Sequence, residues 1–119
     1  MKVIADTAVA LVAVLHFYFL VLEMFLWTRP FGLKTFGLTP EFAQASKALA
    51  ANQGLYNGFI AAWLGWGMVA GSAGYSIKVF FLGCVIVAGV FGGLTASRKI
   101  LWVQAAPGAV ALALVLFSR

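Results

Sequence analysis

Residues 79–96 read VFFLGCVIVAGVFGGLTA, a stretch with no charged residue. Its length fits the roughly 17–25 apolar residues that an α-helix needs to cross the hydrocarbon core of a bilayer. Inside that core each backbone N–H and C=O must be satisfied within its own segment, which favours a helix. The run is continuously apolar, whereas the strands of a membrane barrel alternate apolar and polar residues. The stretch therefore predicts a transmembrane helix.

Three further runs of similar length are mostly apolar, at residues 3–27, 48–69 and 100–117. Together the four runs predict an all-α integral membrane protein, a bundle of four transmembrane helices in antiparallel up-down order. We expect a single transmembrane domain over residues 1–119. Its helices are predicted near 3–27, 41–70, 77–97 and 100–117.

The composition of the whole chain agrees with a membrane protein. Hydrophobic residues make up 64% of the 119 residues, charged residues only 9%, and the mean hydropathy is +1.04. A soluble domain carries about 25% charged residues, so this chain has too few polar groups to cover a water-soluble globule. The N-terminal run is too long for the apolar core of a usual signal peptide, and no small-residue cleavage site follows it, so we expect it to be retained.

The charged and metal-binding residue types exclude several classes of function. The sequence pI is about 9.8, but the eight Lys and Arg residues lie at the ends of apolar runs and form no stripe, which argues against nucleic-acid binding. Cys84 is the single cysteine and His16 the single histidine, so neither an intramolecular disulfide nor a cage of such ligands is expected. No nucleotide-binding glycine loop, HExxH motif or catalytic triad is present. We expect no metal and no cofactor.

The connection over residues 28–47 is the one long link between the predicted helices. Because it holds Pro30, Gly32 and Gly37, we expect it to begin as turns. Thr39-Pro40-Glu41 then resembles a helix start, with Thr39 as N-cap and Pro40 at the first helical position. The second helix is therefore predicted to begin in water and to enter the membrane near Lys47.

The distribution of basic residues predicts the orientation of the four spans. One side of the membrane receives Lys2, Lys78 and Arg119, and the other receives Arg29, Lys34, Lys47, Arg98 and Lys99. Cytoplasmic loops carry the excess of Lys and Arg. We therefore expect the long first loop to be cytoplasmic and both termini to be extracytoplasmic.

The first predicted helix carries two ionisable residues inside its apolar run, His16 and Glu23. They are seven positions apart and share one helix face, which Trp27 continues. An ionisable group inside a span is costly unless it is paired or wetted. Glu23 could form a structural latch with Lys47 or Arg98, and His16 could be a hydrogen-bonded residue between helices. The alternative is a polar pocket in which both contact a substrate or relay a proton.

The second predicted helix carries the densest group of polar side chains. They occupy one stripe by i, i+1, i+4, i+5 spacing, namely Asn52, Gln53, Tyr56 and Asn57. These groups cannot face lipid without loss, so they must face the first helix, another subunit or a cavity. A hydrogen bond between membrane helices contributes only about 0.6 kcal/mol on average, a small return that favours a binding site. Gly54 and Gly58 support the purely structural alternative, since small residues at this spacing let helices approach closely.

The third and fourth predicted helices look structural. Four glycines should give the third helix a smooth packing face, namely Gly83, Gly89, Gly92 and Gly93. In the fourth helix, Pro107 removes a backbone hydrogen bond and should kink the span about one turn earlier. The kink lies beside Gln104, which is therefore a further candidate for lining a cavity, although ordinary bundle geometry would explain the proline as well.

Two motifs together resemble a known family. HFYFLVLEMFLW at residues 16–27 and NQGLYNG at residues 52–58 are similar to the small bacterial membrane proteins called domain of unknown function 1304, and the resemblance extends to the Gln104-x-x-Pro107 helix. It implies a multi-pass protein of the bacterial inner (plasma) membrane with four spans, and it supplies no established activity.

A more distant similarity is to the membrane-associated eicosanoid and glutathione metabolism proteins, which are four-span trimers. Their second helix carries an Arg-x-x-x-Asn-x-x-Glu pattern that binds glutathione between subunits. The matching register here holds Lys47, Asn52 and Tyr56, without the Arg and the Glu. The similarity therefore implies only that a polar second helix can face a subunit interface.

These observations favour one function and leave two alternatives. The favoured hypothesis is a protein that binds a small amphiphilic or lipid-like molecule in a polar intramembrane pocket between the first two helices. Its partners would be membrane lipids and that ligand. The alternatives are an oligomeric transporter or channel subunit, as a dimer or trimer, and a structural scaffold without a ligand site. The candidate ligand-binding residues are His16, Glu23, Trp27, Asn52, Gln53, Tyr56, Asn57 and Gln104.

Overall fold

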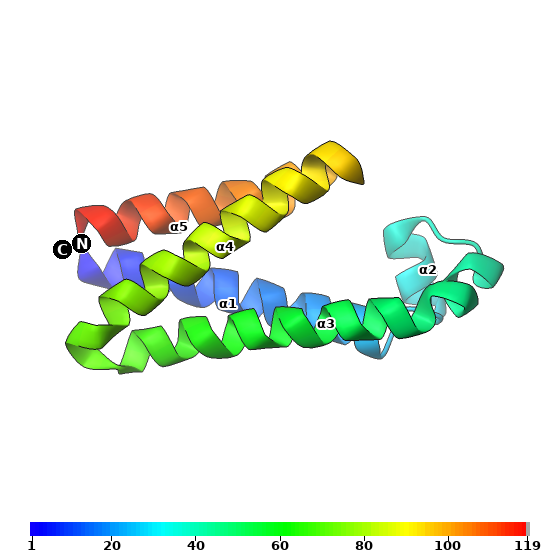
Figure 1. Ribbon diagram of the computed structural model, residues 1–119, viewed down its shortest axis with the longest axis horizontal. Coiled ribbons are helices and arrows are strands. Elements are labelled where there is room, and N and C mark those ends of the chain that lie inside the picture. The colour runs from blue at the N-terminus through cyan, green and yellow to red at the C-terminus, as the bar shows by residue number, and fades with distance from the viewer. Residues whose placement is uncertain (119) are drawn as a thin grey trace. The chain divides into compact units, whose positions relative to one another are not determined.

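A computed structural model describes residues 1–118, and within that range the chain forms helices and no strand. The all-α class predicted from the sequence is therefore confirmed. In chain order the elements are α1 (Lys2–Met24), α2 (Pro30–Phe36), α3 (Pro40–Val69), the 3-10 turn η1 (Gly71–Ala73), α4 (Gly74–Thr95), the π-helical turn η2 (Leu101–Ala105) and α5 (Ala106–Phe117) (Figure 1).

The start of α3 follows the predicted capping pattern. The helix begins at Pro40, and the backbone N–H of Phe42 donates to the Thr39 hydroxyl at 3.1 Å. This hydrogen bond satisfies one of the N–H groups that a helix start leaves without an intrahelical partner. The predicted N-cap is confirmed.

The segment before α3 differs from the prediction, since residues 30–36 form helix α2 and not turns. Pro30 occupies its start, where the fixed φ of proline suits a helix and the missing N–H costs nothing. Gly37 ends it with a left-handed φ of 66°, and its N–H donates to the Leu33 carbonyl. The connection thus begins as a turn at residues 28–29, as predicted, but Pro30 and Gly37 then form the two ends of a short helix and Gly32 lies inside it.

The chain divides into two compact units. The central unit is Val14–Ala61, which includes the second half of α1, all of α2 and most of α3. The terminal unit combines Met1–Ala13 with the chain from Ala62 onward.

The terminal unit is built on the antiparallel pair α4 and α5 (Figure 1). Its core holds Leu64, Leu82 and Val115, all buried. Glycines set how closely the pair packs, because Gly89 lies against the backbone of Ala105 and Gly108 lies against Val85. Gly92 and Gly93 likewise lie against Ile100 and Leu101, so the predicted packing face is confirmed for these glycines, whereas Gly83 has no atom within 4 Å of an added Cβ and does not belong to it.

The turn η2 lies directly before Pro107, over Leu101–Ala105. Proline cannot donate to the carbonyl four residues earlier, and its ring crowds that carbonyl. A π-helical turn, which closes each hydrogen bond one residue later than an α-helix, is one way to accommodate this defect. The irregularity falls where the sequence predicted a disturbance of the helix.

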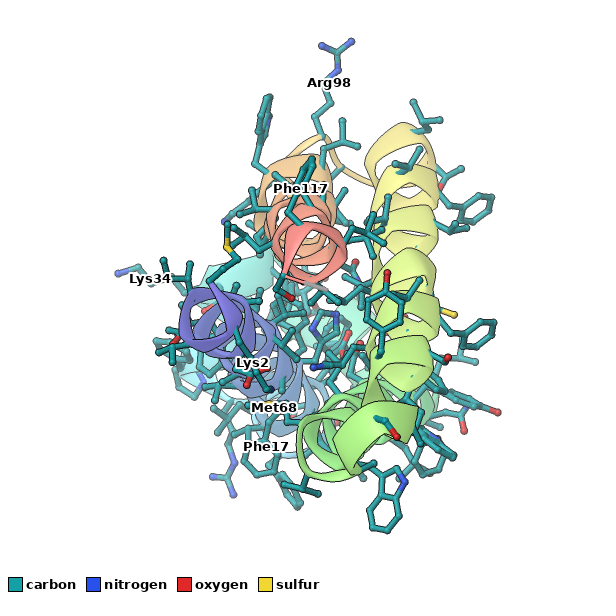
Figure 2. All side chains as sticks on the ribbon, turned by 90° about the vertical axis from the view of Figure 1, so that its left-hand side faces the viewer. Lys2, Phe17, Lys34, Met68, Arg98 and Phe117 are labelled. Carbon is teal, nitrogen blue, oxygen red and sulfur yellow. The ribbon has the colours of Figure 1, made fainter. Side chains whose placement is uncertain are left out.

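Two helices of the described chain are long and apolar enough to cross a membrane, namely Lys2–Met24 and Gly71–Thr95. The helix Leu101–Phe117 is apolar but shorter. Large side chains on these helices are exposed, including Leu11, Phe80 and Phe91, and Figure 2 shows side chains of α4 projecting on the side away from α5. Length, composition and exposed apolar surface thus indicate membrane association.

Candidate functional site

A carboxyl–amide pair lies in the central unit between α1 and α3. The side-chain Nδ2 of Asn57 donates to Oε1 of Glu23 at 2.6 Å, and Glu23 is only 8% exposed. This distance is at the short end of the range for a hydrogen bond between nitrogen and oxygen. The candidate latch from Glu23 to Lys47 or Arg98 is not the arrangement found, because the polar partner of Glu23 is Asn57.

Two glycines on α3 allow this close approach. A Cβ added to Gly54 would lie 3.0 Å from the Cβ of Glu23 and 2.8 Å from the Cγ of Met24. A Cβ added to Gly58 would lie 2.5 Å from a methyl carbon of Leu20. The small-residue spacing therefore positions the site, since it brings Asn57 within hydrogen-bond distance of α1.

The second carboxyl oxygen of Glu23, Oε2, has no hydrogen-bond partner among residues 1–118. No buried side-chain nitrogen or oxygen in that range lacks a partner, so Oε2 keeps some accessible surface. An ionised carboxyl group accepts through both oxygens, and a protonated one can also donate. Glu23 thus combines one oxygen that Asn57 binds with one whose hydrogen-bonding capacity is unused within residues 1–118.

The other polar residues of the predicted stripe are exposed and make no hydrogen bond to α1 within residues 1–118. Asn52 and Gln53 are exposed, and Tyr56 is 59% exposed with its ring edge-on to Phe59 at 5.6 Å. The structure therefore divides the stripe, with Asn57 in the helix contact and three neighbours on the outer surface. The sequence allowed the stripe to face the first helix, another subunit or a cavity. In the structure, Asn57 is the one residue of the stripe that is hydrogen-bonded to the first helix.

Trp27 makes a separate group of contacts just after α1. Its indole N–H donates to the Ser46 hydroxyl at 3.0 Å, and its ring lies 5.0 Å from that of Phe36. These contacts join the end of α1 to α2 and α3. The structure gives Trp27 a positioning role at the α1–α2 connection.

The last two candidate residues lie in different units. His16 is completely buried in the central unit and meets the ring of Phe19 edge-on at 5.2 Å. Gln104 lies in η2 of the terminal unit and is half-buried. Of the eight sequence candidates, the structure places Glu23 and Asn57 in direct contact.

The terminal unit also contains a charged cluster that the sequence did not predict. Oδ2 of Asp6 accepts from Nζ of Lys2 at 2.8 Å, and Oδ1 accepts from Nζ of Lys78 at 3.4 Å. The predicted topology already placed Lys2 and Lys78 on one side of the membrane, and Asp6 is the acidic residue next to Lys2 in sequence. That combination could have pointed to the cluster. Within residues 1–118, no three His, Cys, Asp or Glu side chains gather as a metal site would require.

Comparison with known proteins agrees with the resemblance noted in the sequence. The family described as protein of unknown function (DUF1304) matches residues 10–116. The uncharacterized protein YpaA of Lactococcus lactis subsp. lactis is 32% identical over 104 residues, which cover 86% of this chain and 87% of that protein. No solved structure matches the chain. The family match and the similarity to YpaA span most of the chain, which therefore belongs to the DUF1304 family.

Proposed function

We propose that this chain is a four-span protein of the bacterial inner membrane that binds the polar head of a small amphiphilic molecule at Glu23. The observation that supports this most directly is the accessible Oε2 of an otherwise buried carboxyl group. Asn57 holds the other oxygen, so the group is fixed in place before a ligand arrives. A group fixed in advance loses less conformational entropy when it binds.

The length of α3 supports this location for the site. Its 30 residues span about 45 Å, more than the roughly 30 Å hydrocarbon core. If the span ends at Val69, about 20 residues reach back to Ala50, so Asn52 and Gln53 would lie at the headgroup level. Asn57, five residues after Asn52, would lie about 7.5 Å deeper, at 1.5 Å per residue. Exposed amides suit that interface, whereas the buried pair suits the apolar layer beneath it.

The chemistry of the site selects a class of ligand. The accessible oxygen of Glu23 favours a hydroxyl or amine donor, and the exposed amides of Asn52 and Gln53 can both donate and accept. An apolar tail would lie against exposed side chains of the same surface, such as Phe59. A long-chain alcohol or amine has these two parts.

Binding of dodecylamine or 1-dodecanol tests the proposal. In a maltoside detergent, native mass spectrometry should detect an adduct of either probe on the wild-type protein. Glu23→Gln should weaken binding about tenfold, because hydrogen bonds to charged groups contribute about 1.5–3 kcal/mol. Gln53→Ala should weaken it less.

The control matched to Gln53→Ala is Gln44→Ala, which makes the same change at an exposed residue nearer the start of α3. It should leave probe binding unchanged. Equal binding by the wild-type protein and Glu23→Gln, with both folded, would remove the basis for a site at Glu23.

The orientation of the spans forms part of this proposal. Within the described residues, Lys2 and Ser118 lie at the same end of the terminal unit, as an even number of spans requires. With both termini extracytoplasmic, a periplasm-active reporter such as alkaline phosphatase should be active when fused after residue 118. At residues 34–38 the periplasm-active reporter should be inactive, and a reporter that works only in the cytoplasm should be active. The reverse pattern would overturn the orientation.

The exposure of Asn52, Gln53 and Tyr56 also favours a second candidate. A second copy of the chain could cover this polar surface, as in an oligomeric transporter or channel subunit. Native mass measurement in mild detergent separates the two candidates, because a strict monomer is compatible with amphiphile binding and incompatible with the oligomer.

A further inference from the structure

The terminal unit contains an open cavity of about 390 Å³ at the end that carries the chain termini. The functional groups that line it share the capacity to donate hydrogen bonds. They are Lys2, Ser72, Tyr75, Ser76, Lys78 and Ser118. None of these residues belongs to the candidate site at Glu23, so the cavity is a separate feature of the molecule.

The charges around the cavity do not cancel. Lys2 and Lys78 contribute two positive charges, and Asp6, which contacts both, contributes one negative charge. The start of α4 at Gly74 adds the partial positive charge of a helix N-terminus beside Ser76. The cavity therefore has an excess of positive charge.

Lys78 has more hydrogen-bonding capacity than its surroundings use. The residue is only 9% exposed, although lysine is among the residues least often buried. Its ammonium group carries three donors. Within residues 1–118 its one hydrogen-bond partner is Oδ1 of Asp6, at the long distance of 3.4 Å. A buried cation with unused donors, beside a cavity, is suited to receive an anion.

Asp6 is bound more closely by the other lysine. The Lys2 contact is 2.8 Å, against 3.4 Å for Lys78. The carboxyl group of Asp6 is thus paired chiefly with Lys2, which is the more exposed of the two lysines. An anion entering the cavity could approach Lys78 without displacing the Lys2–Asp6 pair.

We propose that this cavity binds a phosphate oxyanion, with Lys78 as the central cation and the hydroxyls of Ser72 and Ser76 as further donors. Three or four phosphate oxygens can accept from donors in different directions, which matches a cavity lined by ammonium and hydroxyl groups. Two sources supply this chemistry, an anionic phospholipid headgroup and free phosphate. The proposal does not depend on the amphiphile site at Glu23.

The test uses the full chain in dodecyl maltoside, a detergent without phosphate. One arm adds phosphatidylglycerol to the micelles, with diacylglycerol as the lipid lacking phosphate, and the other adds inorganic phosphate. Native mass spectrometry and thermal shift report binding. Lys78→Gln should weaken binding of the phosphate probe about tenfold, as expected for a lost charge-assisted hydrogen bond. Lys99→Gln, the same change at an exposed lysine in the α4–α5 connection, should leave binding unchanged.

Asp6→Asn gives the most discriminating result, because it should strengthen binding of the phosphate probe, whereas Lys78→Gln should weaken it. It removes the negative charge that competes for both lysines while keeping a side chain of similar shape. Binding of the phosphate probe should tighten severalfold. Simple damage to the fold would weaken binding.

Each outcome has a defined meaning. Phosphatidylglycerol binding with this variant pattern identifies a lipid headgroup, and inorganic phosphate binding with the same pattern identifies a soluble anion. Absence of binding in both arms, or equal loss in Lys99→Gln, overturns the proposal. If circular dichroism shows that Lys78→Gln unfolds, the double variant Ser72→Ala/Ser76→Ala decides, and unchanged binding there overturns it.

Discussion

Replacing Gly89 by alanine should destabilise the protein, because the added Cβ has no room between α4 and the chain that follows. It would lie 2.5 Å from the backbone nitrogen and 2.8 Å from the Cα of Ala105. Backbone atoms cannot rotate away as a side chain can, so the two helices must separate. Overpacking of this kind costs about 1–3 kcal/mol in the free energy of unfolding. Titration with a denaturing detergent, followed by circular dichroism, measures the loss.

Gly83→Ala is the matched control on the same helix. No atom lies within 4 Å of the Cβ that this change would add. Alanine is a better helix former than glycine by about 1 kcal/mol, so this variant should be as stable as the wild-type protein or more so. The comparison separates packing from helix propensity. Equal stability of the two variants would show that α4 and α5 do not pack as described.

Asn57→Leu should also cause a large loss of stability, through Glu23. The substitution removes the donor at 2.6 Å and leaves a buried carboxyl group without its partner. Loss of a hydrogen bond to a charged group costs about 1.5–3 kcal/mol, well above the 0.6 kcal/mol average for hydrogen bonds between membrane helices. The same detergent titration measures this effect.

A double-mutant cycle identifies the cause of the loss. Glu23→Leu/Asn57→Leu removes both polar groups, so it should be more stable than Asn57→Leu alone, because no buried carboxyl group remains unpaired. The coupling energy between the two positions should lie in the range of about 0.5–3 kcal/mol seen for contacting residues. Simple additivity of the two single changes would mean that Glu23 and Asn57 do not interact.

The sequence predicts helix positions well where the local chemistry is unambiguous. Thr39-Pro40-Glu41 located the start of α3, since a capping hydroxyl followed by proline has one common structural use. The same kind of reasoning gave a wrong prediction at α2, where residues 30–36 were expected to form turns. Proline and glycine favour turns, but they also favour the two ends of a helix, and only the hydrogen bond from Gly37 to Leu33 distinguishes these uses.

The candidate site was predicted less completely, for a geometric reason. Helical spacing places Asn52, Gln53, Tyr56 and Asn57 on one stripe, but that stripe is wider than the line along which two helices touch. Which residue meets α1 depends on how closely the helices approach, and Gly54 and Gly58 determine that distance. The sequence therefore indicated the right pair of helices without showing that Asn57 alone would reach Glu23.

The cluster of Lys2, Asp6 and Lys78 was missed because its members are far apart in the chain. Each was interpreted by itself as a charge at the edge of an apolar run. Only the folding of the terminal unit brings the start of α1 beside the start of α4. Contacts of this kind carry no local sequence pattern.

The π-helical turn η2 changes how the faces of the last helix should be assigned. A helical wheel assumes a constant rotation of 100° per residue, but residues Leu101–Ala105 turn by less. A single wheel drawn from residue 100 to residue 117 would therefore rotate one half of the segment out of phase with the other. After the turn, the buried residues Gly108, Ala111 and Val115 recur at helical spacing. Comparisons of lipid-facing positions among related chains are meaningful only with two wheels, joined at Ala105.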